Sequence, residues 1–224
     1  MTAANSAAAG RVPRLRVTEV FLSIQGEAAQ VGWPTVFVRL TGCPLRCVWC
    51  DTAYSFTGGD AIGLDALLET VAGFGVRHVC VTGGEPLAQP GCLPLLSDLC
   101  ERGHRVSLET SGALDVSAVD PRVAIVMDLK APGSGETTRN RLDNLRQLKR
   151  GDQVKFVLAD RADFDWALAL LTGNPPAEGV EVLFSPVFGA LEPRVLADWI
   201  LAARAPVRLQ VQLHKLLWGD VPGR

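Results

Sequence analysis

The stretch from His78 to Pro86, HVCVTGGEP, decides the fold class. Its first five residues form an apolar, β-rich run that predicts a buried strand, which the glycine pair Gly83-Gly84 ends. A helical pattern precedes this strand over Leu64–Val71, and another follows over Leu93–Glu101, where Gly103 suits the helix end. This helix–strand–helix order predicts a parallel sheet whose strands are joined by right-handed crossovers.

The same alternation of strand and helix continues along the chain. Strand patterns also cover Arg16–Leu22, Thr35–Leu40, Arg105–Glu109, Val123–Asp128, Val154–Leu158, Val180–Phe184 and Val207–Gln212, and helical patterns cover Leu142–Lys149, Ala162–Leu171 and Pro193–Ala203. A complete eight-unit βα barrel needs about 250 residues, and this chain has 224. The expected fold class is therefore α/β, a partial (open) TIM-like βα barrel of about six units.

The composition is that of a globular protein with little net charge. The chain carries 22 Lys and Arg against 24 Asp and Glu, so its formal net charge is −2. No strong field attracts a nucleic-acid backbone or an anionic membrane surface, and no apolar run is long enough to cross a bilayer. We therefore expect neither nucleic acid nor a membrane among its partners.

The N-terminal residues MTAANSAAAG have neither the charged start nor the apolar run of a signal peptide. We expect residues 1–14 to form a flexible N-terminal tail. Residues 15–224 are expected to form a single domain, because this length fits one domain and no linker-like segment interrupts it.

Three of the six cysteines, Cys43, Cys47 and Cys50, lie within eight positions in the stretch TGCPLRCVWCDT from Thr41 to Thr52. Such clustering without a signal peptide predicts a reducing, cytoplasmic location and a metal or cluster site rather than disulfides. The four iron corners of a [4Fe–4S] cluster usually take thiolates, so three cysteines leave one iron open to a small molecule. A zinc site, which usually closes with four ligands, and unligated buried cysteines remain alternatives.

This CxxxCxxC loop, placed after an early strand, resembles that of the radical S-adenosylmethionine (SAM) superfamily. The resemblance implies that the methionine part of SAM chelates the open iron, and that one electron cleaves SAM to a 5′-deoxyadenosyl radical. Cys43, Cys47 and Cys50 are then the catalytic metal ligands, and Trp49 lies near the adenine. A packed loop aromatic is the alternative interpretation of Trp49.

Polar residues follow several of the expected strands, at the strand ends where barrel enzymes carry their chemistry. Thr82–Pro86 resembles the radical SAM segment that hydrogen-bonds the SAM amino group, and adjacent glycines let a backbone approach a ligand closely. Lys130 is suited to pairing with a carboxylate, although an ordinary solvated lysine is the alternative. The expected SAM-binding residues are Trp49, Cys50, Asp51, Gly83, Gly84, Glu85, Glu109, Ser111, Lys130 and Ser185.

Two further stretches, SIQGE at 23–27 and LHKLLWGD at 213–220, resemble one radical SAM family, the 7-carboxy-7-deazaguanine synthases of queuosine and 7-deazapurine biosynthesis. The resemblance runs from about Arg16 to the last residue. It implies a lyase of a tRNA-modification pathway that converts 6-carboxy-5,6,7,8-tetrahydropterin to 7-carboxy-7-deazaguanine with loss of ammonia, while SAM is regenerated as a cofactor. It also implies Mg²⁺, an electron donor of the flavodoxin or ferredoxin type, and a homodimer.

The residues allow a physical account of substrate binding. Arg39 offers the planar, bidentate cation that suits a carboxylate, although a surface arginine at a strand end is the alternative. Gln25 and Gly26 offer an amide and a close backbone to the pterin edge, and the hard oxygen of Thr52 suits Mg²⁺. The resemblance gives the substrate-binding set as Ile24, Gln25, Gly26, Arg39, Thr82, His214 and Arg224.

Two other functions fit parts of the pattern. A radical SAM activating enzyme, which makes a glycyl radical on a partner protein, shares the barrel and the cysteine loop but often needs further ferredoxin-type cysteines. Cys80, Cys92 and Cys100 are too widely spaced to hold a second cluster. A zinc-binding or electron-transfer module would not need polar segments at successive strand ends.

Overall fold

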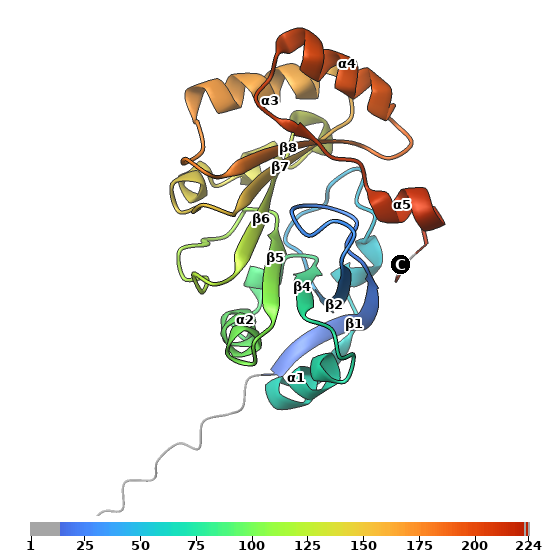
Figure 1. Cartoon of the computed structure of the whole chain (residues 1–224), viewed down its shortest axis with the longest axis vertical. Coiled ribbons are helices and arrows are strands. Elements are labelled where there is room, and N and C mark those ends of the chain that lie inside the picture. Colours follow the sequence, from blue (N-terminus) through green and yellow to red (C-terminus); the bar gives the residue numbers. More distant parts are fainter. Residues whose placement is uncertain (1–13, 222, 224) are drawn as a thin grey trace, which may run out of the picture.

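One mixed β-sheet connects the strands of the computed structural model, which describes residues 14–221 and 223 (Figure 1). The strands are β1 (Arg14–Ile24), β2 (Pro34–Leu40), β3 (Asp60–Gly63), β4 (His78–Gly83), β5 (Arg105–Thr110), β6 (Ala124–Leu129), β7 (Gln153–Leu158), β8 (Glu181–Pro186) and β9 (Arg208–Leu209). They lie in the order β3-β1-β2-β4-β5-β6-β7-β8-β9.

The sheet is mostly parallel and does not close on itself. Every pairing from β2–β4 to β8–β9 is parallel, whereas β1 runs antiparallel to both β2 and β3. The two edge strands, β3 and β9, are not paired with each other. This open, predominantly parallel sheet confirms the expected α/β fold with a partial TIM-like barrel, and it adds an antiparallel edge that the strand–helix alternation did not indicate.

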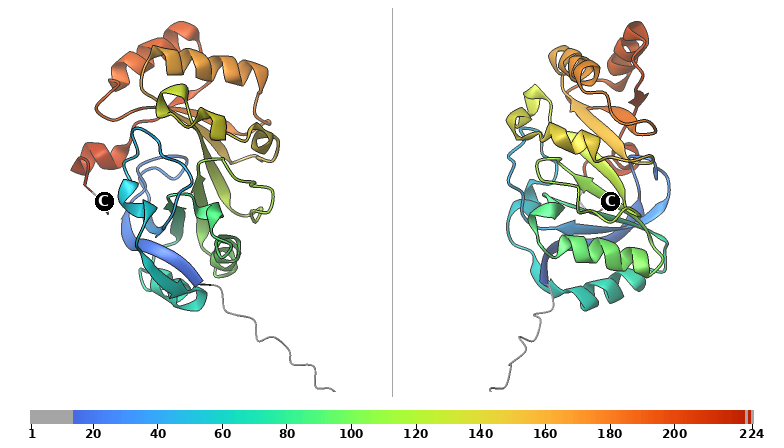
Figure 2. Two further views of the ribbon diagram at one scale, coloured as in Figure 1. Left: turned by 180° about the vertical axis from the view of Figure 1, so that it is seen from behind. Right: turned by 90° about the vertical axis from the view of Figure 1, so that its left-hand side faces the viewer.

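Helices join several of the parallel strands. They are α1 (Leu64–Ala72), α2 (Cys92–Glu101), α3 (Arg161–Gly173), α4 (Pro193–Ala203) and the short α5 (Leu213–Trp218). The first two pack near β1 and β5, whereas α3 and α4 pack near β7 and β8 at the other end of the sheet (Figure 2). The β5–β6 and β6–β7 connections, which are fully described, contain turns and short 3₁₀ segments instead of α-helices.

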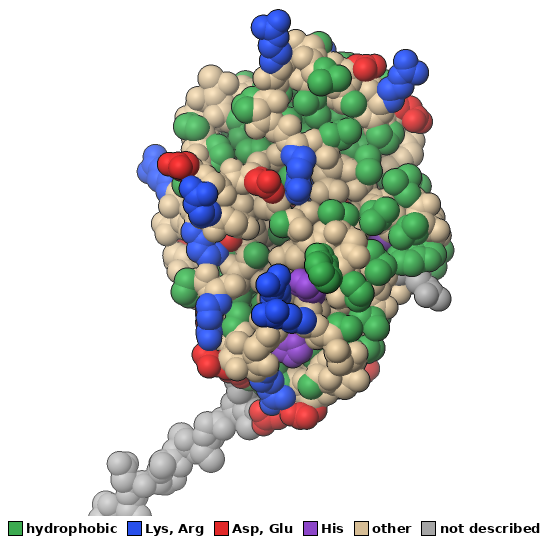
Figure 3. Space-filling view, viewed as in Figure 1, with side chains coloured by type: hydrophobic (Ala, Val, Ile, Leu, Met, Phe, Trp, Pro, Cys, Tyr) green, Lys and Arg blue, Asp and Glu red, His purple; other side chains and the backbone are tan. Residues whose placement is uncertain are grey.

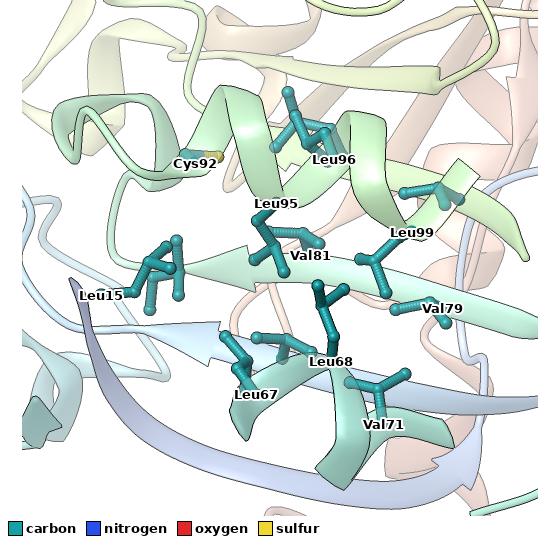
Figure 4. Packing of buried hydrophobic residues seen from close by; sticks show 14 of the residues in the cluster. Leu15, Leu67, Leu68, Val71, Val79, Val81, Cys92, Leu95, Leu96 and Leu99 are labelled. Atoms are coloured by element: carbon teal, nitrogen blue, oxygen red, sulfur yellow. The ribbon is translucent and has the colours of Figure 1, made fainter. Parts of the chain in front are cut away.

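Two hydrophobic clusters hold the helices to the sheet. In the first, α1 buries Leu64, Leu67, Leu68 and Val71, the i, i+3, i+4, i+7 stripe of an amphipathic helix (Figure 4). In the second, the rings of Phe156, Phe164 and Phe184 meet edge to face, with Phe184 placed 5.4 Å from Phe156 and 5.7 Å from Phe164 between ring centroids. Both clusters lie between the sheet and its helices.

A β-bulge in β1 changes which side chains face the core. Leu15 and Val17 are buried in the first cluster, so odd-numbered residues face the helices in the first part of the strand. The register with β2 then shifts between Val17 and Glu19. Beyond the shift the even-numbered Val20 packs against that core, while Phe21 faces the opposite side and stacks on Phe37. A bulge adds one residue to a strand and thereby exchanges its two faces.

Two elements differ from their predicted form. The helix predicted over Leu142–Lys149 is a 3₁₀ segment, Leu142–Arg146, because the Asn144 amide donates to the carbonyls of Gly112 and Leu114 and fixes a tight turn. The strand predicted over Val207–Gln212 shrinks to the two residues of β9. Beyond β9 the chain leaves the sheet, and Leu213 donates its backbone N–H to the carbonyl of Gly26.

The remaining differences concern short elements and the chain ends. Strand β3 and helix α5 have four and six residues, too few for a clear period in the sequence. The expected tail includes Arg14, which is in fact the first residue of β1, and residues 1–13 and Arg224 lie outside the described residues. The single domain expected over 15–224 stays a prediction. In the described part of the chain, no helix is long and apolar enough to cross a membrane.

Candidate active site

A cavity of about 540 Å³ lies at the carboxyl ends of the parallel strands. Its walls come from β1 and β2, from the cysteine loop (residues 42–50), from the ends of β4 to β7, and from the C-terminal segment that contains α5. Barrel enzymes place their chemistry at this end of the strands. The cavity therefore brings together segments that are as far apart in the chain as Phe21 and Gly223.

The three clustered cysteines all line this cavity. Backbone hydrogen bonds fix their loop from two sides, since Gly42 donates to the carbonyl of Ser55 (2.8 Å) and Val48 to that of Ser134 (3.0 Å). Burial raises the pKa of the Cys43 and Cys47 thiols above the ordinary value. A bound iron would deprotonate these thiols outright, because a coordinating cation reverses the local pKa argument.

The donor set fits an iron–sulfur cluster better than a single zinc ion. Among the described residues, no three His, Cys, Asp or Glu side chains converge on one point suited to a metal ion. A cuboidal cluster needs no such convergence, because each thiolate binds its own iron. Cys80 and Cys92 are buried away from the cavity, and the charged neighbours of His214 are Glu27, Lys215, Asp51 and Glu109. Three thiols therefore stand in the cavity without a fourth cysteine.

The glycine pair Gly83-Gly84 lets the end of β4 pass directly beneath the cysteine loop. A Cβ atom on Gly83 would collide with the backbone of Leu40, and one on Gly84 would collide with Gly42 and the side chain of Cys43. The close approach is sealed by backbone bonds, in which Gly84 donates to Leu40 (3.1 Å) and Glu85 donates to Gly42 (2.8 Å). The absence of side chains at both positions therefore allows β4 to pack against the cysteine loop.

The Glu85 side chain turns away from the cavity. Its carboxylate is fully buried and accepts hydrogen bonds from the backbone N–H of Leu87 (3.0 Å), from the Thr110 hydroxyl (2.9 Å), and from the backbone and hydroxyl of Ser111 (2.8 and 2.5 Å). These donors occupy the carboxylate. Glu85 therefore fixes the end of β5, and it is Ser111 rather than the Glu85 side chain that lines the cavity.

Three predicted residues form a polar chain across the cavity wall. Thr82 donates its hydroxyl to Glu109 (3.0 Å), and the Gln25 amide approaches the other oxygen of Glu109 at 3.5 Å. All three line the cavity, although they come from β4, β5 and the segment after β1. Their groups are suited to reading the polar edge of a heterocycle by hydrogen bonding.

The end of β6 contributes a partly buried ion pair next to the cysteines. Lys130 lies 3.0 Å from Asp128, and both line the cavity. Burial alone would lower the pKa of Lys130, but Asp128 and the neighbouring Cys47 raise it above its ordinary value, so the ammonium stays charged. The second carboxylate oxygen of Asp128 is buried without a hydrogen-bond partner in the described residues. Such an atom is costly to bury unless a ligand satisfies it.

A second ion pair, between Lys155 and Glu27, lies in the cavity wall and is largely buried. The sequence analysis did not assign either residue to the site. Lys155 in the middle of β7 pairs with Glu27, and Gln212 donates to the other oxygen of that carboxylate at 2.6 Å. Burial would raise the pKa of Glu27, yet Lys155 holds it below its usual range. Breaking such a buried pair typically costs about 3–5 kcal/mol. The signal available in the sequence was a lysine within the apolar strand VKFVL.

Arg39 faces the cavity from β2, and β1 holds it there. Its Nε donates to a Glu19 carboxylate oxygen at 2.7 Å, and its guanidinium lies 5.8 Å from the ring centroids of both Phe21 and Tyr54. Its two terminal nitrogens have no hydrogen-bond partner within 14–221 and 223. These nitrogens can therefore receive a carboxylate from the cavity.

The C-terminal segment packs on Gly26, which is buried beside the cavity but is not part of its lining. The ring of His214 lies so near Gly26 that a Cβ atom there would overlap it. Burial lowers the pKa of His214 below its ordinary value, so the ring is neutral at pH 7. Lys215 lies 3.0 Å from Asp51 and 3.2 Å from Asp220, which ties α5 to the residue that follows Cys50.

The remaining predicted residues differ in where they lie. Ile24, Trp49 and Thr52 line the cavity, and the Thr52 hydroxyl lies 3.7 Å from the Cys50 sulfur. Ser185 is buried at the end of β8 outside the cavity lining, and its hydroxyl has no hydrogen-bond partner in the part of the chain described. The expected contact of Arg224 falls outside the described residues. The role of each of these residues stays a prediction.

Comparisons with known proteins agree with this arrangement. The model of the radical SAM superfamily matches residues 37–152. A 7-carboxy-7-deazaguanine synthase of Chlorobaculum tepidum is 46% identical over 208 residues, covering 91% of this chain and 94% of that protein. The enzyme of the same name from Thermoplasma acidophilum is 40% identical, with 92% and 99% covered.

Solved structures give the same result for the fold. The crystal structure of QueE from Escherichia coli has a TM-score of 0.75 and 25% identity, and covers 90% of this chain and 95% of that one. Archaeal TYW1, at 13% identity and a TM-score of 0.56, shares the fold over 77% of this chain and 72% of its own. The sequence and the architecture thus place this chain in the radical SAM superfamily and, within it, in the family of the 7-carboxy-7-deazaguanine synthases.

Proposed function

We propose that this protein converts 6-carboxy-5,6,7,8-tetrahydropterin to 7-carboxy-7-deazaguanine with loss of ammonia, and that it uses SAM as a regenerated cofactor. One observation carries the proposal. Three thiols without a fourth cysteine share a cavity with an arginine whose terminal nitrogens can take a carboxylate. The first feature suits a cluster with an open iron, and the second suits the acidic substituent of the pterin.

Cys43, Cys47 and Cys50 would hold the [4Fe–4S] cluster, and SAM would lie between the cysteine loop and the ends of β4 to β6. When bound and reduced, the cluster and SAM would supply the radical chemistry of this reaction. Gly83 and Gly84 both line the cavity beside the cysteine loop, where their backbone carbonyls would accept hydrogen bonds from the SAM amino group. Charged Lys130 offers a partner to the SAM carboxylate.

The residues on the other side of the cavity would orient the pterin. Arg39 would bind the substrate carboxylate, while Gln25 and Thr82 would hydrogen-bond the polar ring edge. Glu109, which both of these side chains contact, is proposed to bind SAM. Neutral His214 packs on Gly26, lines the cavity, and can accept or donate a hydrogen bond to the substrate. Holding the substrate in one orientation directs the radical to a single hydrogen and keeps water away from the reactive carbon.

Further parts of the proposal concern the surroundings of this reaction. A protein of the flavodoxin or ferredoxin type is proposed to donate the electron, in a reducing cytoplasm that keeps the six cysteines free. Residues 15–224 are proposed to fold as one domain, which the continuous sheet from β3 to β9 supports. Mg²⁺ is proposed to bind at Thr52 together with substrate and water oxygens, since this ion usually keeps several non-protein ligands.

A homodimer is also proposed, and exposed apolar side chains support it. Leu216, Leu217, Trp218 and Val221 are exposed on α5 and the segment after it. Figure 3 shows hydrophobic side chains gathered on the side of the molecule where Figure 1 draws α5. A contiguous apolar surface of this kind typically marks a protein–protein contact.

The reaction is tested by incubating anaerobically reconstituted protein with SAM, a reductant and 6-carboxy-5,6,7,8-tetrahydropterin. We expect a growing ultraviolet absorption of the deazapurine, release of ammonia, and SAM that is not consumed in proportion to product. Formation of 5′-deoxyadenosine without any deazapurine would contradict the proposed substrate while leaving radical SAM chemistry in place.

Replacing Cys43, Cys47 or Cys50 individually with alanine is expected to abolish turnover and to lower bound iron, because each change removes one of three thiolates. Iron and sulfide analysis after anaerobic reconstitution measures this. Cys100→Ala is the matched control, since that thiol lies on α2 outside the cavity and its loss should leave the iron content unchanged. Full activity of any of the three variants would remove that cysteine from the cluster.

Thr52→Ala is expected to abolish the stimulation of pterin turnover by Mg²⁺ while bound iron stays at the wild-type amount, because it removes only a hard oxygen ligand. The measurement is the initial rate over a magnesium titration. Thr57→Ala serves as the control, since Thr57 is exposed outside the cavity lining. An unchanged magnesium dependence in the Thr52 variant would show that the ion binds elsewhere or not at all.

Sedimentation velocity at micromolar concentration is expected to give the mass of a dimer for the wild-type protein. A variant with Leu216→Lys and Leu217→Lys should sediment as a monomer, because charged groups would be buried in the contact. Leu201→Lys on α4, where the side chain is also exposed, should remain dimeric. A wild-type protein that sediments as a monomer would contradict the proposed homodimer.

A further inference from the structure

Glu19 stands beside Arg39 only because of the bulge in β1. In the regular register that pairs Val17 with Leu40, the residue opposite Arg39 would be Thr18. After the shift it is Glu19, and the exchanged faces put Glu19 and Phe21 on the cavity side of the sheet. Bulges recur where a strand must direct a particular side chain toward a functional site.

Glu19 occupies one edge of the Arg39 guanidinium. The carboxylate accepts a hydrogen bond from the Nε–H group at 2.7 Å, and the arginine side chain is only 12% exposed. A guanidinium has a second edge, formed by its two terminal nitrogens, which matches a carboxylate in a bidentate fashion. With the Nε edge taken by the protein, the terminal edge remains for a ligand in the cavity.

Tyr54 completes the arrangement from the cysteine-loop side. Its hydroxyl donates to the same Glu19 oxygen at 2.8 Å, and it follows Cys50 by four positions, in the 3₁₀ segment Ala53–Phe56. The rings of Phe21 and Tyr54 each lie 5.8 Å from the guanidinium carbon and limit how it can tilt.

We propose that Glu19, fixed by Tyr54, is a positioning residue that aims the terminal nitrogens of Arg39 at the carboxylate of the substrate. The inference rests on the proposed function, in which Arg39 binds that carboxylate. A flexible arginine would spread its charge over many orientations, whereas a held one presents a single bidentate edge. Glu19 therefore determines how strongly the enzyme prefers a pterin that carries a carboxylate over one that lacks it.

The test compares two ligands in the reconstituted, SAM-containing enzyme. One is 6-carboxy-5,6,7,8-tetrahydropterin, for which KM and kcat are measured, and the other is 5,6,7,8-tetrahydropterin, measured as a competitive inhibitor. Glu19→Ala should raise KM for the carboxylated pterin by about tenfold, the loss expected for one charge-assisted hydrogen bond. It should leave the inhibition constant of the uncarboxylated pterin within about twofold.

Two milder variants keep the test informative if Glu19→Ala folds poorly. Glu19→Gln retains an oxygen that accepts a hydrogen bond from the Arg39 Nε–H group, so it should recover most of the lost affinity for the carboxylated pterin. Tyr54→Phe removes only the hydroxyl and should weaken that affinity less than Glu19→Ala does. Glu69→Ala is the matched control, because it breaks a 2.7 Å ion pair with Arg102 on the far side of α1 and should change neither constant.

The outcomes separate this inference from the proposed function. If Arg39→Ala raises KM for the carboxylated pterin but Glu19→Ala does not, the positioning role is wrong and the role of Arg39 stands. If the Glu19 variants weaken both ligands equally, Glu19 supports the fold of the site in general and the inference is overturned. If Arg39→Ala itself leaves KM unchanged, the proposed carboxylate contact is wrong.

Discussion

The close contact between the end of β4 and the cysteine loop is the constraint on which the site depends. Gly83 and Gly84 pass so near Leu40, Gly42 and Cys43 that no side chain fits between them. Two backbone hydrogen bonds, from Gly84 to Leu40 and from Glu85 to Gly42, hold the contact. Buried Glu85 then binds the hydroxyl and backbone of Ser111, which fixes the end of β5 relative to the same loop. One pair of glycines thus sets the distance between cluster ligands and strand ends.

The partly buried charges around the cavity are paired within the protein. Arg39 has Glu19, Lys130 has Asp128, and Lys155 has Glu27. Burial would lower the pKa of Arg39, Lys130 and Lys155, but the paired carboxylates raise it above the ordinary value, so all three cations stay charged at neutral pH. Among the described residues, the terminal nitrogens of Arg39 and one oxygen of Asp128 have no hydrogen-bond partner and can therefore bind a ligand. The cavity is therefore prepared for a zwitterionic cofactor and an anionic substrate without an exposed excess of either charge.

Local patterns predicted much of this structure, and long-range pairings were beyond them. The leucine stripe of α1, the apolar β4 and the spacing of Cys43, Cys47 and Cys50 each follow from neighbouring residues. The pairing of Glu27 with Lys155 joins residues 128 positions apart, which no local period reveals. The bulge near Thr18 leaves no local pattern either, so nothing in the sequence marks Glu19 as a site residue. Glu85 differs in the opposite sense. The motif marks it as a SAM-binding residue, whereas its buried carboxylate bonds to Thr110 and Ser111 of the protein itself.

The proposed chemistry requires that three thiolates hold a cluster whose fourth iron stays open for SAM. Electron paramagnetic resonance of the anaerobically reconstituted and reduced protein tests it most directly, with spectra recorded before and after SAM is added. We expect a [4Fe–4S]⁺ signal whose g-values shift when SAM binds the open iron. A signal that SAM leaves unchanged, or a protein that retains zinc in place of iron and sulfide, would contradict it.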